Sequence, residues 1–276
     1  MILTLVSKIL VLIIVNGWIG YMLKDNQNRD EIAVVVGATG AFGSSLVDRL
    51  SQAGLAVIAV ARSQNALLAL KEKVPGLIAC AADIASDSAI DIIAAAINRP
   101  VRMVVHGPGV GIAGGILTAP TATMVDAVNI KVGGLLRLVR AVDSRMMIGS
   151  RIVAIGGHYG FEPTAYAASA GVANAALMNV VRQLSLALGP RGVTAHLIAP
   201  GPADTERLRR VAADRAAIRN VSLEVVLNEM LSESSIGRFT TPEQVAWAVS
   251  ILLAPEADAL TGSSLMLDSG RRRGLP

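Results

Sequence analysis

The 276-residue chain has one cysteine, Cys80, and only 3% aromatic residues. A single cysteine excludes an internal disulfide and any metal cluster held by several cysteines, so we expect no metal site. Its apolar neighbours predict a buried small hydrophobic residue. The net charge of +4 comes with no helix-turn-helix pattern, zinc-ligand spacing or aromatic stacking platform, so nucleic acid is not an expected partner. The arginines instead cluster in Glu206–Arg219 and in the basic tail 271–276, which indicates a solvated helix face and a flexible end.

Charge is nearly absent from residues 1–23. Their apolar core, residues 9–23, is shorter than the roughly 20 residues that cross a bilayer, and no small-residue cleavage site follows it. Three interpretations stay open: a membrane-associating helix, an extra helix packed on the domain, or sequence upstream of a misassigned start, with Met22 the true initiator. We favour the last, because two of the five lysines fall in the first 24 residues. Residues 24–30 form a polar linker before the domain at Glu31. We expect a cytoplasmic protein, with membrane association only through this first segment.

A glycine-rich turn follows the first apolar run. After Glu31, residues 32–36 are apolar and mostly β-branched, as in a parallel strand buried on both faces, and a helical pattern follows the turn. Glycines between a strand and a helix let the backbone approach a pyrophosphate, whose charge then lies at the helix N-terminus. The flanking strand and helix make the pattern more specific. The predicted dinucleotide contacts are Gly37, Thr39, Gly40, Phe42 and Gly43.

No acidic residue ends the second apolar run, residues 55–61. An acidic side chain there would bind the ribose 2′-hydroxyl of NAD. Arg62 and Ser63 stand there instead, and a planar guanidinium suits a 2′-phosphate. The expected cofactor is therefore NADP, used as NADPH.

The most informative segment is residues 153–171, which read Val-Ala-Ile-Gly-Gly-His-Tyr-Gly-Phe-Glu-Pro-Thr-Ala-Tyr-Ala-Ala-Ser-Ala-Gly. It resembles the active-site segment of the short-chain dehydrogenase/reductase family, which has Ile-Ser-Ser ahead of a Tyr-x-x-x-Lys motif. The resemblance covers about residues 31–270. It implies an α/β fold, a single doubly wound Rossmann domain with a seven-stranded parallel sheet and a helical lid at about 206–236. It also implies a homodimer or homotetramer.

The resemblance adds cofactor residues, namely Asp83, Ile84, Gly109, Pro200, Gly201 and Thr205. The first two match the pair that borders the adenine, and the last three match a turn that holds the nicotinamide amide and phosphates. The glycine is retained in His106-Gly-Pro-Gly109, where the family has Asn-Asn-Ala-Gly. We interpret His106 as a structural residue at a strand end.

Two positions that carry the family's chemistry are changed. Asn129 matches the asparagine that holds a water in the proton relay, and Tyr166 matches the tyrosine that passes the proton. Both lie on expected helices, residues 123–146 and 164–188. The serine that polarises the substrate carbonyl is Gly157, and the lysine that lowers the tyrosine pKa is Ala170. A free tyrosine has a pKa of about 10, so alcohol oxidation, which needs tyrosinate, should suffer more than carbonyl reduction, which needs the neutral form.

Other side chains near these positions offer partial replacements. His158 and Tyr159 stand beside Gly157, and His158 is a candidate acid; the alternative is that both only line the pocket. Gly157 and Tyr166 are nine positions apart, a shorter loop than the family's, so the alignment can slip here. Lys131 stands two residues beyond the helix asparagine, which places it on another helix face, and we do not count it as the replacement.

The expected function is NADP(H)-dependent reduction of a carbonyl or activated double bond in a small molecule. Tyr166 would act as the acid and Asn129 would organise water. The Leu, Val and Met content of the lid suggests an apolar substrate. Two alternatives from other classes stay open, because fold alone does not fix function. One is a cofactor-binding pseudoenzyme or partner subunit, and the other is a non-redox isomerase or cyclase in the same pocket.

Overall fold

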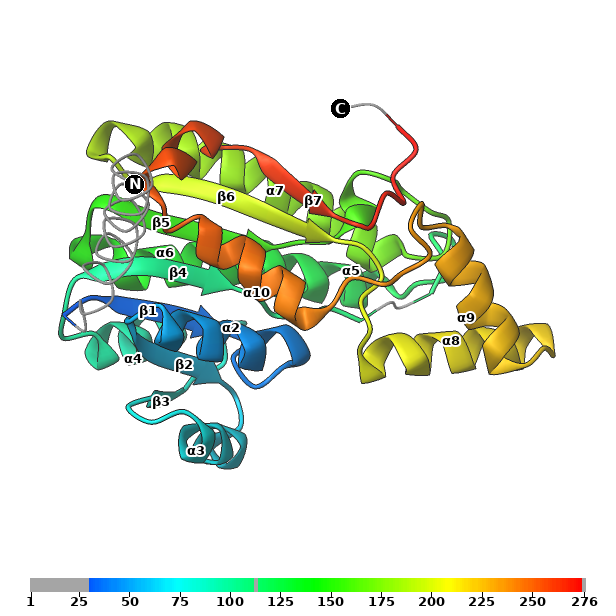
Figure 1. Cartoon of the computed structure of the whole chain (residues 1–276), viewed down its shortest axis with the longest axis horizontal. Helices are drawn as coiled ribbons and strands as arrows, with labels where there is room; N and C mark the ends of the chain where they lie inside the picture. The colour runs from blue at the N-terminus through cyan, green and yellow to red at the C-terminus, as the bar shows by residue number, and fades with distance from the viewer. Residues whose placement is uncertain (1–29, 112–113, 275–276) are drawn as a thin grey trace, which may run out of the picture.

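The computed structural model describes residues 30–111 and 114–274. The expectations for residues 1–23, an anchor, an extra helix or a misassigned start, and for most of the 24–30 linker lie outside the described residues. Seven parallel strands form one sheet in the order β3-β2-β1-β4-β5-β6-β7 (Figure 1). This strand order, with crossover helices between strands, is that of a doubly wound Rossmann sheet and confirms the predicted fold class.

The strands are β1 (Ile32–Val36), β2 (Ala56–Ala61), β3 (Ile78–Ala81), β4 (Val101–His106), β5 (Met146–Ile155), β6 (Thr194–Pro200) and β7 (Ser264–Leu267). The α-helices are α2 (Ala41–Gln52), α3 (Gln64–Lys73), α4 (Ala89–Ala96), α5 (Thr121–Val128), α6 (Gly134–Val142), α7 (Ala168–Leu188), α8 (Glu206–Arg219), α9 (Leu223–Ser232) and α10 (Pro242–Ile251). A π-helical turn, η1, spans Asn129–Gly133, and short 3-10 turns span Asp143–Arg145, His158–Gly160, Gly189–Arg191 and Pro255–Leu260.

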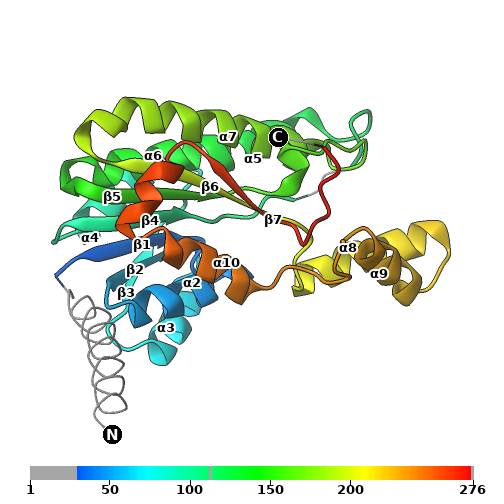
Figure 2. The same ribbon diagram turned by 45° about the horizontal axis from the view of Figure 1, so that its top comes forward.

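Helices cover both faces of the sheet because its strands are apolar on both sides. Helices α4, α6 and α7 pack on one face through side chains such as Leu138 and Leu177, and α2, α3 and α10 pack on the other through Leu46 and Val249 (Figure 2). Cys80 in β3 is buried, as predicted, and burial raises the pKa of its thiol. Among the described residues, no helix is both long and apolar enough to cross a membrane.

The amino-terminal edge of the sheet is held by buried polar side chains. Arg151 Nε donates to the carbonyl of Leu252 at 2.8 Å, and its guanidinium pairs with Asp258 at 2.7 Å. His196 is fully buried and its Nδ1 bonds the carbonyl of Leu260 at 3.2 Å. These contacts anchor the segment after α10 at the end of the sheet away from the glycine turn.

The helix expected over residues 123–146 is not one continuous α-helix. The π-helical turn Asn129–Gly133 separates α5 from α6, and Met146 already belongs to β5. The segment passes close to β4 here, because a Cβ on Gly134 would stand 2.8 Å from Cε1 of His106. Apolar periodicity could not reveal this break, because one π turn hardly changes the pattern.

The helix expected over residues 164–188 begins later, at Ala168, so Tyr166 precedes α7 instead of lying on it. The carbonyl of Ala165 accepts a hydrogen bond from the backbone N–H of Ile116 at 2.8 Å. This carbonyl is therefore committed to a neighbouring loop and not to the helical ladder. Consequently Tyr166 and Ala170 do not lie together on one face of a helix.

Candidate functional site

The glycine turn lies at the carboxyl end of β1 and has the shape that a dinucleotide requires. Gly37 has φ of +82°, a left-handed conformation that favours glycine. A Cβ on Gly43 would stand 2.6 Å from Cα of Ala38, so the start of α2 packs against the turn without room for a side chain. The first turn of α2, after Gly40, contains no acidic residue that would repel an anion. The predicted contacts in the same turn and at the start of α2 are Thr39 and Phe42.

The residues predicted to bind the adenosine end follow β2 and β3. Arg62 and Ser63 are exposed just after β2, and Ser63 Oγ caps α3 by accepting a backbone N–H at 3.3 Å. Asp83 follows β3 and accepts the N–H of Ala85 at 3.1 Å, while Ile84 is buried. All of them lie at the carboxyl ends of neighbouring strands, which is where open α/β sheets bind ligands.

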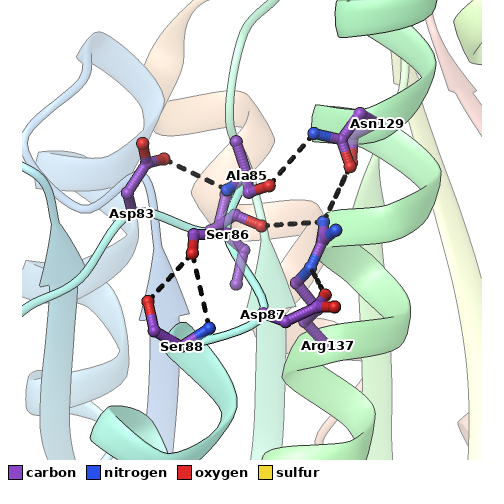
Figure 3. A network of polar contacts seen from close by, with 8 residues as sticks. Asp83, Ala85, Ser86, Asp87, Ser88, Asn129 and Arg137 are labelled. Atoms are coloured by element: carbon purple, nitrogen blue, oxygen red, sulfur yellow. Dashed lines mark hydrogen bonds and ion pairs between the residues drawn. The ribbon is translucent and has the colours of Figure 1, made fainter.

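Asn129 connects the π-helical turn to the loop after β3 (Figure 3). Its Nδ2 donates to the carbonyl of Ala85 at 3.0 Å, and its Oδ1 accepts from Arg137 at 2.9 Å. Arg137 in turn pairs with Asp87 at 2.6 Å. Both ends of the Asn129 amide are therefore bonded to the protein, which fixes the turn against the cofactor half of the sheet.

The other predicted cofactor residues follow β4 and β6, and are Gly109, Pro200, Gly201 and Thr205. The Thr205 hydroxyl caps α8 by accepting a backbone N–H at 3.3 Å. In the first turn of α8, Arg207 reaches across to the loop after β4, where it donates to the carbonyl of Val110. A Cβ on Gly109 would stand 2.6 Å from this guanidinium. A side chain at this position would therefore collide with the arginine.

Tyr166 lies in a hydrogen-bonded pair with Tyr159. Their hydroxyl oxygens are 2.9 Å apart, and the two rings meet edge to face with centres 5.8 Å apart. Arg215 from α8 covers the Tyr166 ring, with its Cζ 4.2 Å from the ring centre. The Nη2 atom of Arg215 is buried and has no hydrogen-bond partner among the described residues. A pocket of about 270 Å³ opens beside the pair and is lined by His158, Glu162, Pro163, Thr164, Tyr166, Glu233, Arg271 and Arg273.

The two tyrosines have different acidities. Burial opposes ionisation of Tyr166, but the hydrogen bond with Tyr159 and the charges of Arg215 and Arg271 outweigh it, so the pKa of Tyr166 lies below its usual 10. Burial, together with the hydrogen bond to Tyr166, raises the pKa of Tyr159. Of the pair, Tyr166 is therefore the more ready to give up its proton.

His158 does not have the pKa expected of a candidate acid. It is buried, and burial together with the charge of Arg271 lowers its pKa from 6.5 to about 4. At neutral pH the imidazole is therefore uncharged and holds no excess proton to donate. Its ring stacks against Tyr159, with centres 4.1 Å apart. The lowered pKa favours Tyr166 over His158 as the acid, and the role of His158 stays a prediction.

The residue of α7 that faces Gly157 is not the one that the Tyr-x-x-x-Lys spacing selects. Counting from Tyr166 places the lysine position at Ala170, but the residue that faces Gly157 is Asn174. Its Nδ2 lies 2.9 Å from where a Cβ on Gly157 would stand. Its Oδ1 is buried and has no hydrogen-bond partner among the described residues. Ala170 packs instead in a small apolar cluster against which Tyr159 lies.

Lys131 points into the protein from the π-helical turn. It is 4% exposed, and its Nζ donates to the carbonyl of Ile155, the last residue of β5, at 2.7 Å. Burial, together with the charge of Arg207, lowers the pKa of Lys131 from 10.5 to about 7. His106 is the structural strand-end residue that was predicted, fully buried with Nε2 donating to the carbonyl of Ile130 at 3.0 Å. Burial and the neighbouring Lys131 lower the pKa of His106 to about 3.

Three residues of this site were missed from the sequence: Asn174, Arg215 and Arg271. A polar side chain in the alanine-rich α7 was the available signal for Asn174. For the two arginines the sequence predicts a solvated helix face and a basic tail, and nothing in their spacing indicates a contact with Tyr166. Such contacts join segments that are distant in the chain, so only the folded structure shows them.

A glycine turn at the carboxyl end of the first strand of a doubly wound sheet, with a buried polar cluster beside it, is the arrangement in which such folds bind nucleotides. The family model described as enoyl-(acyl carrier protein) reductase matches residues 37–272. With this match over most of its length, the chain belongs to the short-chain dehydrogenase/reductase family.

Relatives with known names cover nearly the whole chain. The short-chain reductase protein NovJ of Streptomyces niveus is 29% identical over 262 residues, which are 88% of this chain and 95% of that protein. The 3-oxoacyl-[acyl-carrier-protein] reductase FabG of Escherichia coli is 26% identical over 247 residues, 87% of this chain and 96% of the relative. The crystal structure of a variant actinorhodin polyketide ketoreductase with NADPH is 25% identical, with a TM-score of 0.80 over 88% of this chain and 97% of the other.

Proposed function

We propose that the protein is an NADPH-dependent reductase of a carbonyl group or activated double bond, with Tyr166 as the proton donor. The observation that carries the proposal is the Tyr159–Tyr166 pair beneath Arg215, which lowers the pKa of a phenol beside the pocket. Names of relatives support the keto group as the reacting function, because several are ketoacyl reductases or ketoreductases.

The choice of NADPH rests on Arg62. Its exposed guanidinium directly follows β2, where a 2′-phosphate would accept two parallel hydrogen bonds. The actinorhodin ketoreductase and an L-sorbose reductase that resemble this chain are described as NADPH complexes. The glycine turn, Asp83, Ile84, Gly109 and the segment from Pro200 to Thr205 would hold the rest of the cofactor.

The residues of this chain supply the proton and the environment for reduction. NADPH, when bound, supplies a hydride to the electrophilic carbon of the substrate. Tyr166 donates its phenolic proton to the oxygen, or to the α-carbon of an activated alkene, and Tyr159 donates a hydrogen bond that stabilises the phenolate left behind. Asn129 fixes the π-helical turn through its side chain. We further propose that this turn holds a water molecule, which returns a proton to Tyr166.

The composition of the lid predicted an apolar substrate, but the structure removes the main argument for that prediction. The lid's apolar side chains form a small core of their own, with Leu208, Ala212, Ala216, Val226 and Met230 packed on one another. The pocket beside Tyr166 contains glutamates and arginines instead. We propose a small carbonyl compound with at least one polar group near the reacting carbon.

Replacement of Tyr166 by phenylalanine tests the proposal. Tyr166→Phe removes the proton donor and keeps the ring beneath Arg215, so NADPH consumption with a ketone substrate should fall by about 100-fold or more. Tyr159→Phe, which removes only the supporting hydrogen bond, is expected to lose about 10-fold. Unchanged turnover in Tyr166→Phe would overturn the reductase mechanism.

A cofactor-binding pseudoenzyme is the second candidate, and the site gives it one specific observation. Gly157 and Ala170 lack the family's serine and lysine, and Asn174, the residue that faces Gly157, carries no charge. In that case NADPH would bind but no ketone would be reduced. Saturable turnover with any ketone would exclude it.

We also propose a homodimer or homotetramer. Apolar side chains on α5 and α7 are exposed, with 61% of Val125, 44% of Val172 and 68% of Leu186 accessible. Helix faces of this kind are commonly covered by a second copy. A monomer in sedimentation analysis would exclude this assembly.

A further inference from the structure

Arg215 holds its positive charge against the group that would transfer the proton. Its guanidinium carbon lies 4.2 Å from the centre of the Tyr166 ring, and that ring's hydroxyl bonds Tyr159 at 2.9 Å. A cation over an aromatic face is attracted by the ring. It stabilises a phenolate more than a neutral phenol, because the phenolate carries a full negative charge. The contact therefore acts on the acidity of Tyr166.

Other charged and titratable groups face Tyr159 and Tyr166, but several of them already have an ion-pair or hydrogen-bond partner. They are His158 and Tyr159 from one 3-10 turn, Glu162 after it, Glu233 after α9, and Arg271 and Arg273 after β7. Arg271 is ion-paired with Glu233. Glu162 accepts the backbone N–H groups of Arg273 and Gly274. Arg215 differs, because no carboxylate in the described chain pairs with it and its Nη2 is buried without a partner.

The position of Arg215 in the fold gives this contact a second consequence. Arg215 is carried by α8, which projects with α9 beyond the carboxyl ends of the strands (Figures 1 and 2). The main domain supplies Tyr159 and Tyr166 from the segment between β5 and α7. The charge and the phenol therefore belong to two parts that meet only when α8 lies against that segment.

We propose that Arg215 takes the place of the family's lysine, as a positioning residue on the lid that makes Tyr166 acidic only while α8 is closed over it. The catalytic meaning of this statement rests on the proposed function, but the contact itself does not. The lysine of the family acts from the same helix as its tyrosine. Here the charge would arrive from the segment that covers the substrate, so closure over a substrate and activation of the proton donor become one event.

A tyrosinate absorption titration of the full chain tests the proposal without a substrate. The chain has only three tyrosines, Tyr21, Tyr159 and Tyr166, so the titration is simple to resolve. Tyr166→Phe identifies the signal of Tyr166 by its loss. Arg215→Met should raise the midpoint of that signal by about one pH unit or more, because one close positive charge is worth about 1–3 pKa units.

Arg219→Met is the matched control. Arg219 lies one turn farther along α8, half-exposed and paired with Glu229, so its loss should leave the Tyr166 midpoint unchanged. Arg215→Lys keeps the charge and should hold the midpoint within about half a pH unit of the wild type. Circular dichroism across the titration confirms that each variant stays folded.

The outcomes separate this inference from the proposed function. A Tyr166 midpoint in folded Arg215→Met equal to that of the wild type would overturn the role of Arg215. An equal upward shift in Arg219→Met would overturn it too, because the effect would then be a general one of the lid. If Arg215→Met shifts the midpoint while Tyr166→Phe leaves turnover unchanged, the coupling stands and the reductase mechanism fails.

Discussion

The two halves of the sheet differ in how closely they keep the family's pattern. Around β1 to β3, the glycine turn follows β1 and Arg62 follows β2, as the pattern of strands, turn and helix predicted. Around β5 to β7, Gly157 and Ala170 stand where the family has polar groups, and Tyr166 lies outside α7 beneath Arg215 of α8. Cofactor binding depends on backbone shape, which a short glycine pattern encodes. Proton transfer depends on a few side chains, and these can be supplied from elsewhere in the fold.

The largest expected effect on stability comes from Lys131, the buried lysine that bonds the end of β5 in the half of the sheet that departs from the family's pattern. Its pKa falls from 10.5 in the unfolded chain to about 7 in the fold. Between these values the unfolded chain binds a proton that the folded chain does not, so the free energy of unfolding rises with pH. At about 1.4 kcal/mol per pKa unit, the gain from pH 7 to above pH 10 is at most about 5 kcal/mol. Below pH 7 both states are protonated and the full cost of the buried charge remains.

Lys131→Met removes this dependence, and urea unfolding from pH 6 to 10 measures it. The variant should be the more stable protein at pH 6, and its advantage should shrink as the pH rises. Lys71→Met, at an exposed lysine on α3, is the control and should show no such trend. A constant stability difference between wild type and Lys131→Met across this range would mean that Lys131 titrates alike in both states. The changed half would then contain no strained charge.

The fold was predictable to a large extent, because its signals are local. Apolar runs of the right length predicted the strands, and the glycine pattern placed the first turn. The expected helices failed at two points. Residues 129–133 form a π turn beside β4, and α7 starts late because the carbonyl of Ala165 bonds the N–H of Ile116. Both deviations depend on contacts between distant segments, which periodicity does not contain.

Of the candidate site, the sequence predicted the positions at the strand ends but not the contacts around Tyr166. The positions of Arg62 and Asp83 follow from strand ends, which sequence patterns mark. The contact between Arg215 and Tyr166 depends on how the lid lies on the domain. Helix geometry predicts that Lys131 lies on another face from Asn129, and the two side chains do bond different segments. Lys131 nevertheless reaches the end of β5, because its turn passes beside the sheet.

A smaller effect is expected in the half of the sheet that would bind the cofactor, where Arg62 can be replaced. Arg62→Ala removes the guanidinium that would bind the 2′-phosphate, so the Kd for NADPH should rise by about 10- to 100-fold. The Kd for NADH, which lacks this phosphate, should stay nearly unchanged. Nicotinamide fluorescence titration measures both. Arg145→Ala, at an exposed arginine before β5, is the control and should affect neither. Equal weakening for both cofactors would show that Arg62 does not select the phosphate.

The smallest expected effect is that of restoring the family's serine at position 157. In Gly157→Ser, the new Cβ would stand 2.9 Å from Nδ2 of Asn174, closer than packed atoms allow. The amide lies at the end of its side chain and can turn, so we expect a cost of only about 1–2 kcal/mol in urea unfolding. In an Asn174→Ala background the obstacle is gone, and the same substitution should cost about 1 kcal/mol less. An equal cost in both backgrounds would mean that the two positions are independent. A reduced cost would show that the amide of Asn174 is what opposes a side chain at position 157, so that restoring the serine alone does not restore the family's arrangement.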